Sequence, residues 1–557
     1  MAEHILSKDD ERAAQNCEAQ LHKIGIYLAY PPNVELEAEG LGRYLAMLLS
    51  GFAKNGSKGI PVLCPSWSAT QLAALLEAES VDSEVIEIIS PRGRPYALTM
   101  WMIVAGYRSK ISRSRALHAM LRGLVRIKAA VAETTRRALS NLAASFVQIF
   151  SIPMLLRFLV TQSWLLLVMS ALVPVILITS LISSAVRQAQ RVLSALPASL
   201  TALAGPSPHQ VAFVPYLYDE MLAQEKKRMQ RLGDRLVIDT WYCPTAFWPE
   251  VLDLSSNVVV CVPDFAIRDY PIEFAQLSGA RALRRTNDII IETIAGSRHL
   301  ITYSEAEKSK LVKRFKKREE DIFVLPHATS SLSRYLPGLL PTPDQISDER
   351  PSTSSPRAAR RDKRFSAIKD GSLEFIFYPS QVRPNKNLRT LLKAFAGLRS
   401  SGFPELHLVL TGDLERFSDI TKLARNLKVS EAVFSLGKLP LEALAITYNR
   451  ASATVSPTLS EGGFPFTFSE SVSCRTPVVM GSIPVVIESI EGWTGADEWL
   501  CDPYDAADMS KRVAYVLRNR DSVLENQYQL LKHQLERDWS DVASDLVTIL
   551  SKVGASS

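Results

Sequence analysis

The sequence predicts an α/β protein with two separate domains, each built on a mostly parallel sheet, and a helical insert within the first domain. Short apolar, β-prone runs alternate with amphipathic helical segments, and this alternation occurs twice along the 557 residues. The alternation stops near residue 106, where a basic stretch and then an uncharged stretch follow. The length is sufficient for about three domains of ordinary size.

Composition limits the functional classes. The net charge of +6 is small for this length, so nucleic acid is not expected as a partner. The six cysteines are scattered, without a C-x-x-C pair or a histidine at metal-ligand spacing. This argues against a zinc site or a disulfide framework and fits a reducing compartment. Residues 1–22 are polar and lack the apolar core of a secretory signal.

The first domain is predicted at residues 23–105 and 206–328. Gly40 and Gly42 open its first helix, which ends near residue 53. In such sheets ligands bind beyond the carboxyl ends of the strands, where these glycines fall, so either a plain turn or a phosphate or acceptor contact would explain them. Predicted strands are 23–30, 60–64, 83–90, 210–215, 235–241, 257–262, 289–295, 299–303 and 321–325, and further helices are 69–78, 272–286 and 306–315.

The insert, residues 106–205, has the composition of a membrane-associated segment. Residues 107–137 carry nine Lys and Arg but one acid, Glu133, and residues 158–186 carry no charge. The apolar stretch 164–186 has the ~20 residues needed to cross a bilayer.

Topology restricts how this insert meets a membrane, because the sheet continues after it and the chain must return to the side it left. A hairpin of two spans, 141–160 and 164–186, satisfies this condition, as does a shallow interfacial pair bent at Pro153 and Pro174. A buried helical insert of a soluble domain is the third alternative. The basic flanks favour contact with anionic membrane lipids and an inner-membrane location, with the remaining domains on the cytoplasmic face.

The rest of the chain contains a linker, a second domain and a tail. Residues 329–372 are rich in Ser, Pro and Arg and are predicted to be a disordered linker. The second α/β domain is expected at 373–520, followed by a helical tail at 521–557. Its predicted strands include 375–378, 407–410 and 433–436, and its helices include 388–400, 420–426 and 441–450.

Residues 456–477, S-P-T-L-S-E-G-G-F-P-F-T-F-S-E-S-V-S-C-R-T-P, carry the most specific chemistry. Two carboxylates, Glu461 and Glu470, enclose the Gly462-Gly463 pair, and Pro465 stands where a helix would begin. Glycine lets backbone amides approach an anion, and a helix N-terminus favours negative charge. Carboxylates accept hydrogen bonds from sugar hydroxyls, so the order suits a diphosphate-linked sugar. A βα unit with a tight glycine turn is the alternative.

The chain resembles the retaining GT-B glycosyltransferases of family 4 (group 1), most closely their bacterial mannosyltransferase-like branch. The segments that carry the resemblance are residues 40–44, the Asp264 loop, 380–387, 409–413, 436–437 and 460–477. It implies the GT-B architecture, in which two Rossmann-like domains face a cleft. The donor is then held mainly by the C-terminal domain and the acceptor mainly by the N-terminal domain.

The resemblance also implies residue roles. Lys386 would neutralise the donor diphosphate, Glu461 would lie against the donor sugar, and Glu470 would accept hydrogen bonds from the ribose diol. With Asp264 of the N-terminal loop, Lys386 and Glu461 form the expected catalytic set. The other expected donor-binding residues are Gly462, Gly463, Phe464, Arg383, Gly40, Gly42 and Gly412.

Three features depart from the family pattern. Eight residues separate the two glutamates where the family has seven. Gln381 replaces an arginine, with Arg383 two positions later as a substitute. Pro263 precedes Asp264 where a histidine that contacts the donor sugar is common, and His327 is a candidate to replace it.

The implied activity is retaining transfer of a hexose without a metal or other cofactor, with GDP-mannose as the expected co-substrate. The leaving diphosphate would accept the acceptor proton on the front face, and a covalent intermediate on Glu461 is the alternative. The acceptor would be lipid-linked or a polysaccharide of the bacterial surface, because the insert brings the acceptor domain to the bilayer. The alternative function is a catalytically weak GT-B protein that is a membrane-bound assembly partner of a polysaccharide biosynthesis complex.

Overall fold

The computed structural model describes residues 24–98, 213–336 and 365–555, apart from 33–35, 37–39, 80, 94, 97, 415 and 416. The chain divides into two compact units, one of residues 1–91 and 229–557 and one of residues 92–228. The first unit contains two parallel sheets, and we call the parts built around them the first lobe and the second lobe.

The sheet of the first lobe has seven parallel strands in the order β3-β2-β1-β4-β5-β6-β7. The chain starts in the centre with β1, builds outward to β3 and returns beside β1 with β4, so the strand order reverses between β1 and β4. Ligands of such sheets bind beyond the carboxyl ends of the strands at this reversal. The strands are Ile24–Tyr27, Ile60–Leu63, Ile86–Ile89, Thr240–Cys243, Asn257–Cys261, His299–Thr302 and Ile322–Val324 for β1 to β7.

The sheet of the second lobe repeats this plan with six parallel strands in the order β10-β9-β8-β11-β12-β13. Its reversal lies between β8 and β11, which pair directly. The strands are Phe375–Tyr378, His407–Leu410, Val433–Ser435, Ala453–Ser456, Val478–Gly481 and Leu500–Cys501 for β8 to β13. Two sheets of Rossmann-like order confirm the predicted α/β class with two Rossmann-like domains.

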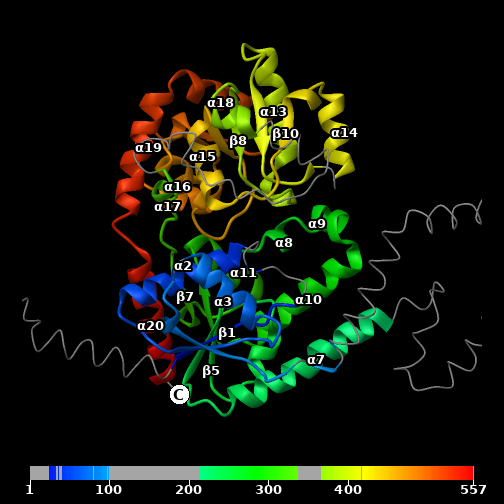
Figure 1. Ribbon diagram of the computed structural model, residues 1–557, viewed down its shortest axis with the longest axis vertical. Helices are drawn as coiled ribbons and strands as arrows, with labels where there is room; N and C mark the ends of the chain where they lie inside the picture. The colour runs from blue at the N-terminus through cyan, green and yellow to red at the C-terminus, as the bar shows by residue number, and fades with distance from the viewer. Residues whose placement is uncertain are drawn as a thin grey trace, which may run out of the picture. The chain divides into compact units, whose positions relative to one another are not determined.

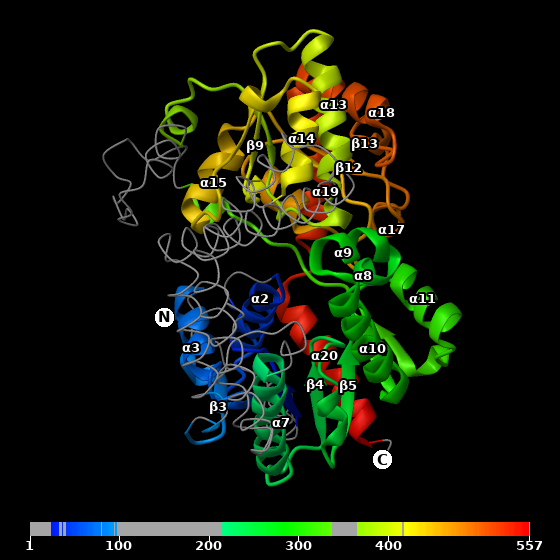
Figure 2. The ribbon, with the colours of Figure 1, turned by 90° about the vertical axis from the view of Figure 1, so that its right-hand side faces the viewer.

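Helices flank both sheets in the ribbon views (Figures 1 and 2). Those of the first lobe are α2 Gly40–Lys54, α3 Ala69–Ala78, α8 Ala266–Asp269, α9 Pro271–Ser278, α10 Ala280–Gly296 and α11 Glu305–Phe315. Those of the second lobe are α13 Leu388–Ser400, α14 Ser418–Asn426, α15 Leu441–Arg450, α16 Phe466–Ser473, α17 Pro484–Ser489, α18 Ala506–Arg518 and α19 Arg520–Gln534.

Several predicted elements of the first domain differ in the structure; the strand expected at 235–241, for example, begins only at Thr240 as β4. The strand expected at 289–295 is part of α10, whose buried residues Leu283, Ile290 and Ile294 recur at helical spacing. The helix expected at 272–286 is divided into α9 and α10 at Gly279. Its positive φ of 87° is a conformation that glycine adopts readily and other residues rarely adopt. The strand expected at 210–215 is wrong from residue 213, where helix α7 (Phe213–Gly233) begins, since helix-favouring residues dominate the following 20 positions.

The last helix, α20 (Trp539–Ala555), packs on the first lobe although it follows the second lobe in sequence. In both ribbon views the chain passes from α19 of the second lobe to α20 beside the first sheet (Figures 1 and 2). Val542, Leu546 and Leu550 are buried in the same apolar core as β1 and α2. The C-terminal tail therefore completes the first lobe.

No helix of the described residues is long and apolar enough to cross a membrane. The candidate spans at 141–160 and 164–186 lie outside the described residues, as does most of the predicted linker.

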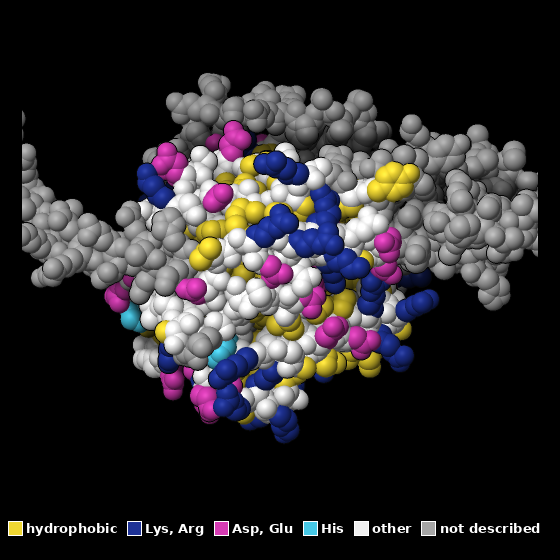
Figure 3. Space-filling model, turned by 90° about the horizontal axis from the view of Figure 1, so that it is seen from below, with side chains coloured by type: hydrophobic (Ala, Val, Ile, Leu, Met, Phe, Trp, Pro, Cys, Tyr) yellow, Lys and Arg dark blue, Asp and Glu magenta, His cyan; other side chains and the backbone are white. Residues whose placement is uncertain are grey.

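Both signs of charge are present on the surface. On the face shown in Figure 3, Lys and Arg side chains stand among Asp and Glu side chains and hydrophobic areas. This mixture agrees with the small net charge of +6.

Candidate functional site

Two loops at the strand reversal of the second lobe carry the central candidate residues. Lys386 lies in the loop after β8, and Glu461 lies in the loop after β11. Because β8 and β11 are parallel neighbours, their following loops emerge side by side at the same edge of the sheet. The topology therefore brings together two residues that are 75 positions apart.

Hydrogen bonds between these loops fix their backbones. The amide of Leu459 donates to the carbonyl of Asn385 at 2.7 Å, and Asn385 Nδ2 donates to the carbonyl of Ser460 at 3.0 Å. The next residue, Asn387, has a left-handed φ of 59° and donates to the carbonyls of Pro457 (3.0 Å) and Pro503 (2.6 Å). These contacts hold Lys386 and Glu461 on a rigid support.

Lys386 and Glu461 form a direct ion pair through Nζ and Oε1. The Thr458 hydroxyl donates to the same carboxylate oxygen at 2.8 Å. The two side chains are 28% and 19% exposed, so ligands can reach them from solvent. A cation at this position can stabilise charge on a departing diphosphate.

Asp264 follows β5 in the first lobe and lies within electrostatic range of Glu461, Lys386 and Arg383. Burial raises the pKa of Asp264, and the Glu461 charge acts in the same direction. The Ala266 amide donates to Asp264 Oδ1 at 2.8 Å and so orients the carboxyl. The predicted catalytic set, Glu461, Lys386 and Asp264, is therefore brought together.

Helix α11 holds the loop that carries Asp264. Lys310 donates to Asp269 at 2.9 Å and to Glu307 at 2.6 Å, and Arg314 also pairs with Asp269. Phe265 stacks on Phe315 with ring centroids 5.4 Å apart. Both ends of α8 are thereby tied to α11.

The Gly462-Gly463 pair lies against the first lobe. A Cβ atom on Gly462 would stand 1.4 Å from the Pro263 carbonyl oxygen, and one on Gly463 would stand 2.4 Å from His327 Nε2. The Ser304 hydroxyl donates to the Gly462 carbonyl at 2.8 Å. The glycines therefore permit close approach of the two loops. A Cβ at position 462 would require a shift of the backbone, and one at position 463 would require a shift of the His327 ring.

Glu470 lies in α16 and is buried. Arg43 Nη1 of α2 donates to its Oε1 at 2.5 Å, and the Ser330 hydroxyl donates to the same oxygen at 3.4 Å. The Tyr448 hydroxyl donates to Oε2 at 2.9 Å. The carboxylate predicted to receive ribose is thus bound by three protein groups.

Of the other predicted donor-binding residues, Gly42, Gly412 and Phe464 pack against neighbouring groups, whereas a Cβ on Gly40 would meet open space. Gly40 and Gly42 form the first turn of α2, and a Cβ on Gly42 would stand 2.1 Å from the Leu36 carbonyl oxygen. Gly412 packs closely on the loop after β8, and Phe464 packs on Phe468 at 5.2 Å. Their contact with a donor remains a prediction.

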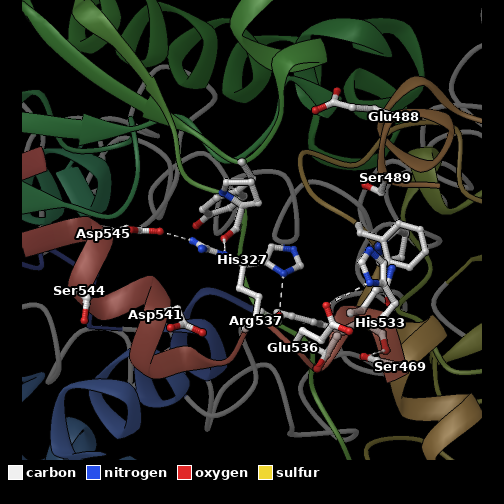
Figure 4. Close-up of a pocket in the computed structure, with 18 residues that line it drawn as sticks. His327, Ser469, Glu488, Ser489, His533, Glu536, Arg537, Asp541, Ser544 and Asp545 are labelled. Carbon is white, nitrogen blue, oxygen red and sulfur yellow. Dashed lines mark hydrogen bonds and ion pairs between the residues drawn. The ribbon is translucent and has the colours of Figure 1, made fainter. Parts of the chain in front are cut away.

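A cavity of about 740 Å³ lies where the chain passes from α19 to α20 (Figure 4). It shares Phe464 and Ser469 with the region of the glycine loop but contains neither Lys386 nor Glu461. Several of its charged groups already have protein partners. Arg537 pairs with Asp545 at 2.7 Å, and Glu488 accepts hydrogen bonds from the first amides of α11 at 2.8 and 2.9 Å. The cavity therefore adjoins the glycine loop but does not include the Lys386–Glu461 pair.

His327 lines this cavity and also supports the glycine loop. Its ring lies 4.4 Å from the Phe466 ring and parallel to the Trp539 ring at 6.4 Å. Burial lowers the pKa of His327, so the ring favours its neutral form. In this position His327 packs beneath Gly463.

Residues 359–531 match the family model of the glycosyl transferases group 1. This region contains Lys386, Glu461 and Glu470, together with the loops that hold them. The match supports the group 1 glycosyltransferase resemblance for the second lobe. Family 4 and the mannosyltransferase branch remain predictions. No curated protein matches the chain in a sequence search.

Solved glycosyltransferase structures are similar to this chain at low identity. Sucrose-phosphate synthase from Thermosynechococcus elongatus is 15% identical, with 61% of this chain and 79% of that chain covered and a TM-score of 0.45. The α,α-trehalose 6-phosphate synthase from Burkholderia multivorans is 14% identical, with 64% and 79% covered and a TM-score of 0.44. HepE from Anabaena, in complex with UDP, is 14% identical, with 60% and 82% covered and a TM-score of 0.43. TM-scores this low do not support the assignment of an activity to this chain.

Sequence reasoning missed the partners of the predicted residues. Arg43, Ser330 and Tyr448 bind Glu470, and Thr458 binds Glu461. Thr458 could have been found from its position three residues before Glu461 in the same loop. The other three are separated from Glu470 by 427, 140 and 22 residues, and no local pattern connects them to it.

Proposed function

We propose that this chain is a retaining, nucleotide-sugar-dependent glycosyltransferase that transfers a hexose, with mannose from GDP-mannose as the donor. The observation that supports it best is the Lys386–Glu461 pair, which lies at a strand reversal inside the region that matches a glycosyl transferase family model. Asp264 of the first lobe lies beside this pair. A cation, two carboxylates and a glycine loop in one place provide the groups that a sugar diphosphate requires.

The reaction that these groups support is a substitution at the anomeric carbon. The bond from this carbon to the diphosphate oxygen breaks, a bond to the acceptor hydroxyl oxygen forms on the same face, and the acceptor proton passes to the leaving diphosphate. Lys386, with Arg383 nearby, would stabilise the charge that develops on the diphosphate. Glu461 and Asp264 would orient the sugar through its hydroxyls.

We also propose a membrane setting for this reaction. The support is the composition of residues 106–205, whose nine basic residues at 107–137 and uncharged run at 158–186 suit a bilayer and its anionic headgroups. A lipid-linked or polysaccharide acceptor of the bacterial surface would then be used at the cytoplasmic face of the inner membrane. Labelling of a Gln162→Cys variant from outside the cell would support the hairpin, and protection there would favour the interfacial pair.

A second candidate is a catalytically weak assembly partner of a polysaccharide complex. It is favoured by Pro263 in the place of the expected histidine, and by the ion pairs that occupy both Lys386 and Glu470. Such a protein would bind a nucleotide-sugar without turnover and would co-purify stably with another membrane protein.

The test is release of nucleoside diphosphate by the purified full chain from a panel of nucleotide-sugars, with and without EDTA. We expect turnover with one donor, GDP-mannose first, and no loss of rate with the chelator. Turnover that EDTA abolishes would contradict metal independence. Absence of turnover with every donor, with or without a glycan or polyprenyl-linked acceptor, would contradict the enzyme and leave the second candidate.

A further inference from the structure

The ion pair between Arg43 and Glu470 joins the two lobes at the candidate nucleotide site. Arg43 Nη1 lies 2.5 Å from Glu470 Oε1, and Arg43 Nη2 donates to the Ser330 hydroxyl at 3.0 Å. The side chains are 24% and 8% exposed, so the pair is largely removed from water. Screening of this pair by solvent and salt is therefore weak.

The hydrogen-bonding capacity of the carboxylate limits what else it can bind. An ionised carboxylate offers about four lone-pair sites, two on each oxygen. In Glu470, both lone-pair sites of Oε1 accept hydrogen bonds, one from Arg43 and one from Ser330. One site of Oε2 accepts a hydrogen bond from Tyr448. A ribose diol presents two donor hydroxyls. Only one of them can be accommodated while Arg43 and Ser330 stay in place.

We propose that Arg43 is a latch on the nucleotide site, and this rests on the proposed function, in which Glu470 receives the ribose diol. The guanidinium occupies the carboxylate when no nucleotide is bound, and an incoming nucleoside diphosphate displaces it. The free energy of breaking the Arg43–Glu470 contact is then subtracted from the free energy of nucleotide binding. The apparent Kd for the nucleotide is then the intrinsic Kd divided by the fraction of molecules in which the Arg43–Glu470 contact is open.

The effect of removing Arg43 on nucleotide affinity distinguishes a latch from a residue that binds the donor phosphates. If Arg43 instead bound the donor phosphates directly, its removal would weaken nucleotide binding. If Arg43 is a latch, its removal strengthens binding. The sign of the change in affinity therefore separates the two roles.

The test is isothermal titration of the full chain with UDP and with GDP. We expect Arg43→Gln to bind its nucleotide more tightly than the native chain by about fivefold or more, the low end of ordinary coupling between sites. Arg425→Gln, at an exposed position of α14, is the control, because it removes a guanidinium from the second lobe without changing the partners of Glu470. It should bind no more tightly than the native chain. Unchanged or weaker binding by Arg43→Gln would overturn the latch.

Two further variants keep the test decisive. If Arg43→Gln does not fold, Ser330→Ala replaces it, since it removes the hydroxyl that lies between the guanidinium and Oε1. Ser330→Ala should then bind more tightly than the native chain, and equal or weaker binding would overturn the latch. Glu470→Gln separates the two hypotheses. If it weakens nucleotide binding while Arg43→Gln also weakens it, the nucleotide site stands and the latch is wrong. Binding that Glu470→Gln leaves unchanged, or no binding by any variant, would contradict both.

Discussion

Single charged residues in this molecule are held by partners that would be costly to remove alone. Glu470 and Glu307 are buried carboxylates, and each pairs with one cation, Arg43 and Lys310 respectively. Removing one member of a buried pair costs roughly 3–5 kcal/mol, because the other charge remains without compensation. Neutral replacements of similar shape are therefore the informative substitutions at this scale.

The pKa of Glu307 predicts how stability depends on pH. Burial raises this pKa from 4.5 to about 7 in the folded chain, against the opposing effect of Lys310. The folded state therefore holds a proton that the unfolded state releases. The stabilisation is present below pH 4.5 and is lost as the pH rises through about 7. Glu307→Gln removes this titration.

Urea unfolding at pH 5 and pH 8 measures the effect. We expect the free energy of unfolding of the native chain to fall relative to Glu307→Gln by about 1–3 kcal/mol between these pH values. Glu305→Gln, at an exposed position of the same helix, is the control and should show a much smaller relative change. Parallel pH profiles for the native chain and Glu307→Gln would contradict the assignment.

Gly462 predicts a strict steric requirement. Its missing Cβ leaves the space that the Pro263 carbonyl fills, so Gly462→Ala must push the two loops apart. We expect a loss of about 1–3 kcal/mol in the free energy of unfolding, as for overpacked sites. Gly397→Ala in α13 is the control, since its Cβ would meet Ser510 Oγ at an ordinary 3.5 Å. Equal unfolding curves for the two variants would show that the loops do not approach so closely.

At the scale of elements, the second sheet depends on a side chain from a helix. Gln527 of α19 is fully buried, donates to the Val478 carbonyl at 2.7 Å and accepts from the Val478 amide at 2.9 Å. Its amide group thus satisfies both backbone groups at the start of β12. Gln527→Leu would leave both groups without a partner in the interior.

Thermal and urea unfolding of Gln527→Leu measure this dependence. Each buried unsatisfied group costs about 1–3 kcal/mol, so we expect a loss of roughly 2–4 kcal/mol. Gln529→Leu, two positions later and exposed, should change the stability little. A near-native stability for Gln527→Leu would mean that water replaces the amide.

Most elements follow from local sequence, and the failures have physical causes. Six of the buried strands, β1, β2, β5, β6, β8 and β9, were predicted because each is a short apolar run beside a turn signal. The run at 289–295 is also β-branched and apolar, but tertiary packing places its apolar residues on one side of α10. Periodicity over a longer window, from Leu283 to Ile294, would have distinguished the helix.

At the scale of the whole molecule, the chain returns to its first lobe after completing its second. Leu546 of α20 is fully buried in the core that contains β1 and α2. Leu546→Ala should therefore destabilise the first lobe by about 2–5 kcal/mol, although it lies near the C-terminus. Hydrogen exchange should show the loss in β1 and β4, with Thr548→Ala, exposed on the same helix, as the control. Loss of protection confined to the second lobe would contradict this packing.

The sequence predicts the part of the candidate site that depends on motifs and strand order, but not the part that depends on contacts between the lobes. Lys386, Glu461 and Asp264 follow strands, so a motif and a topology are enough to place them together. Arg43 could not be assigned to Glu470, because that contact depends on how the two lobes meet across 427 residues.

The central claim is that Lys386 and Glu461 form a donor site for a nucleotide-sugar. The most direct measurement is the rate of nucleoside diphosphate release by Lys386→Ala and by Lys393→Ala, an exposed lysine of α13 in the same lobe. We expect Lys386→Ala to lose about 100-fold or more, as when a group that stabilises developing charge is removed, and Lys393→Ala to stay close to the native rate. Equal rates for the two variants would contradict the site.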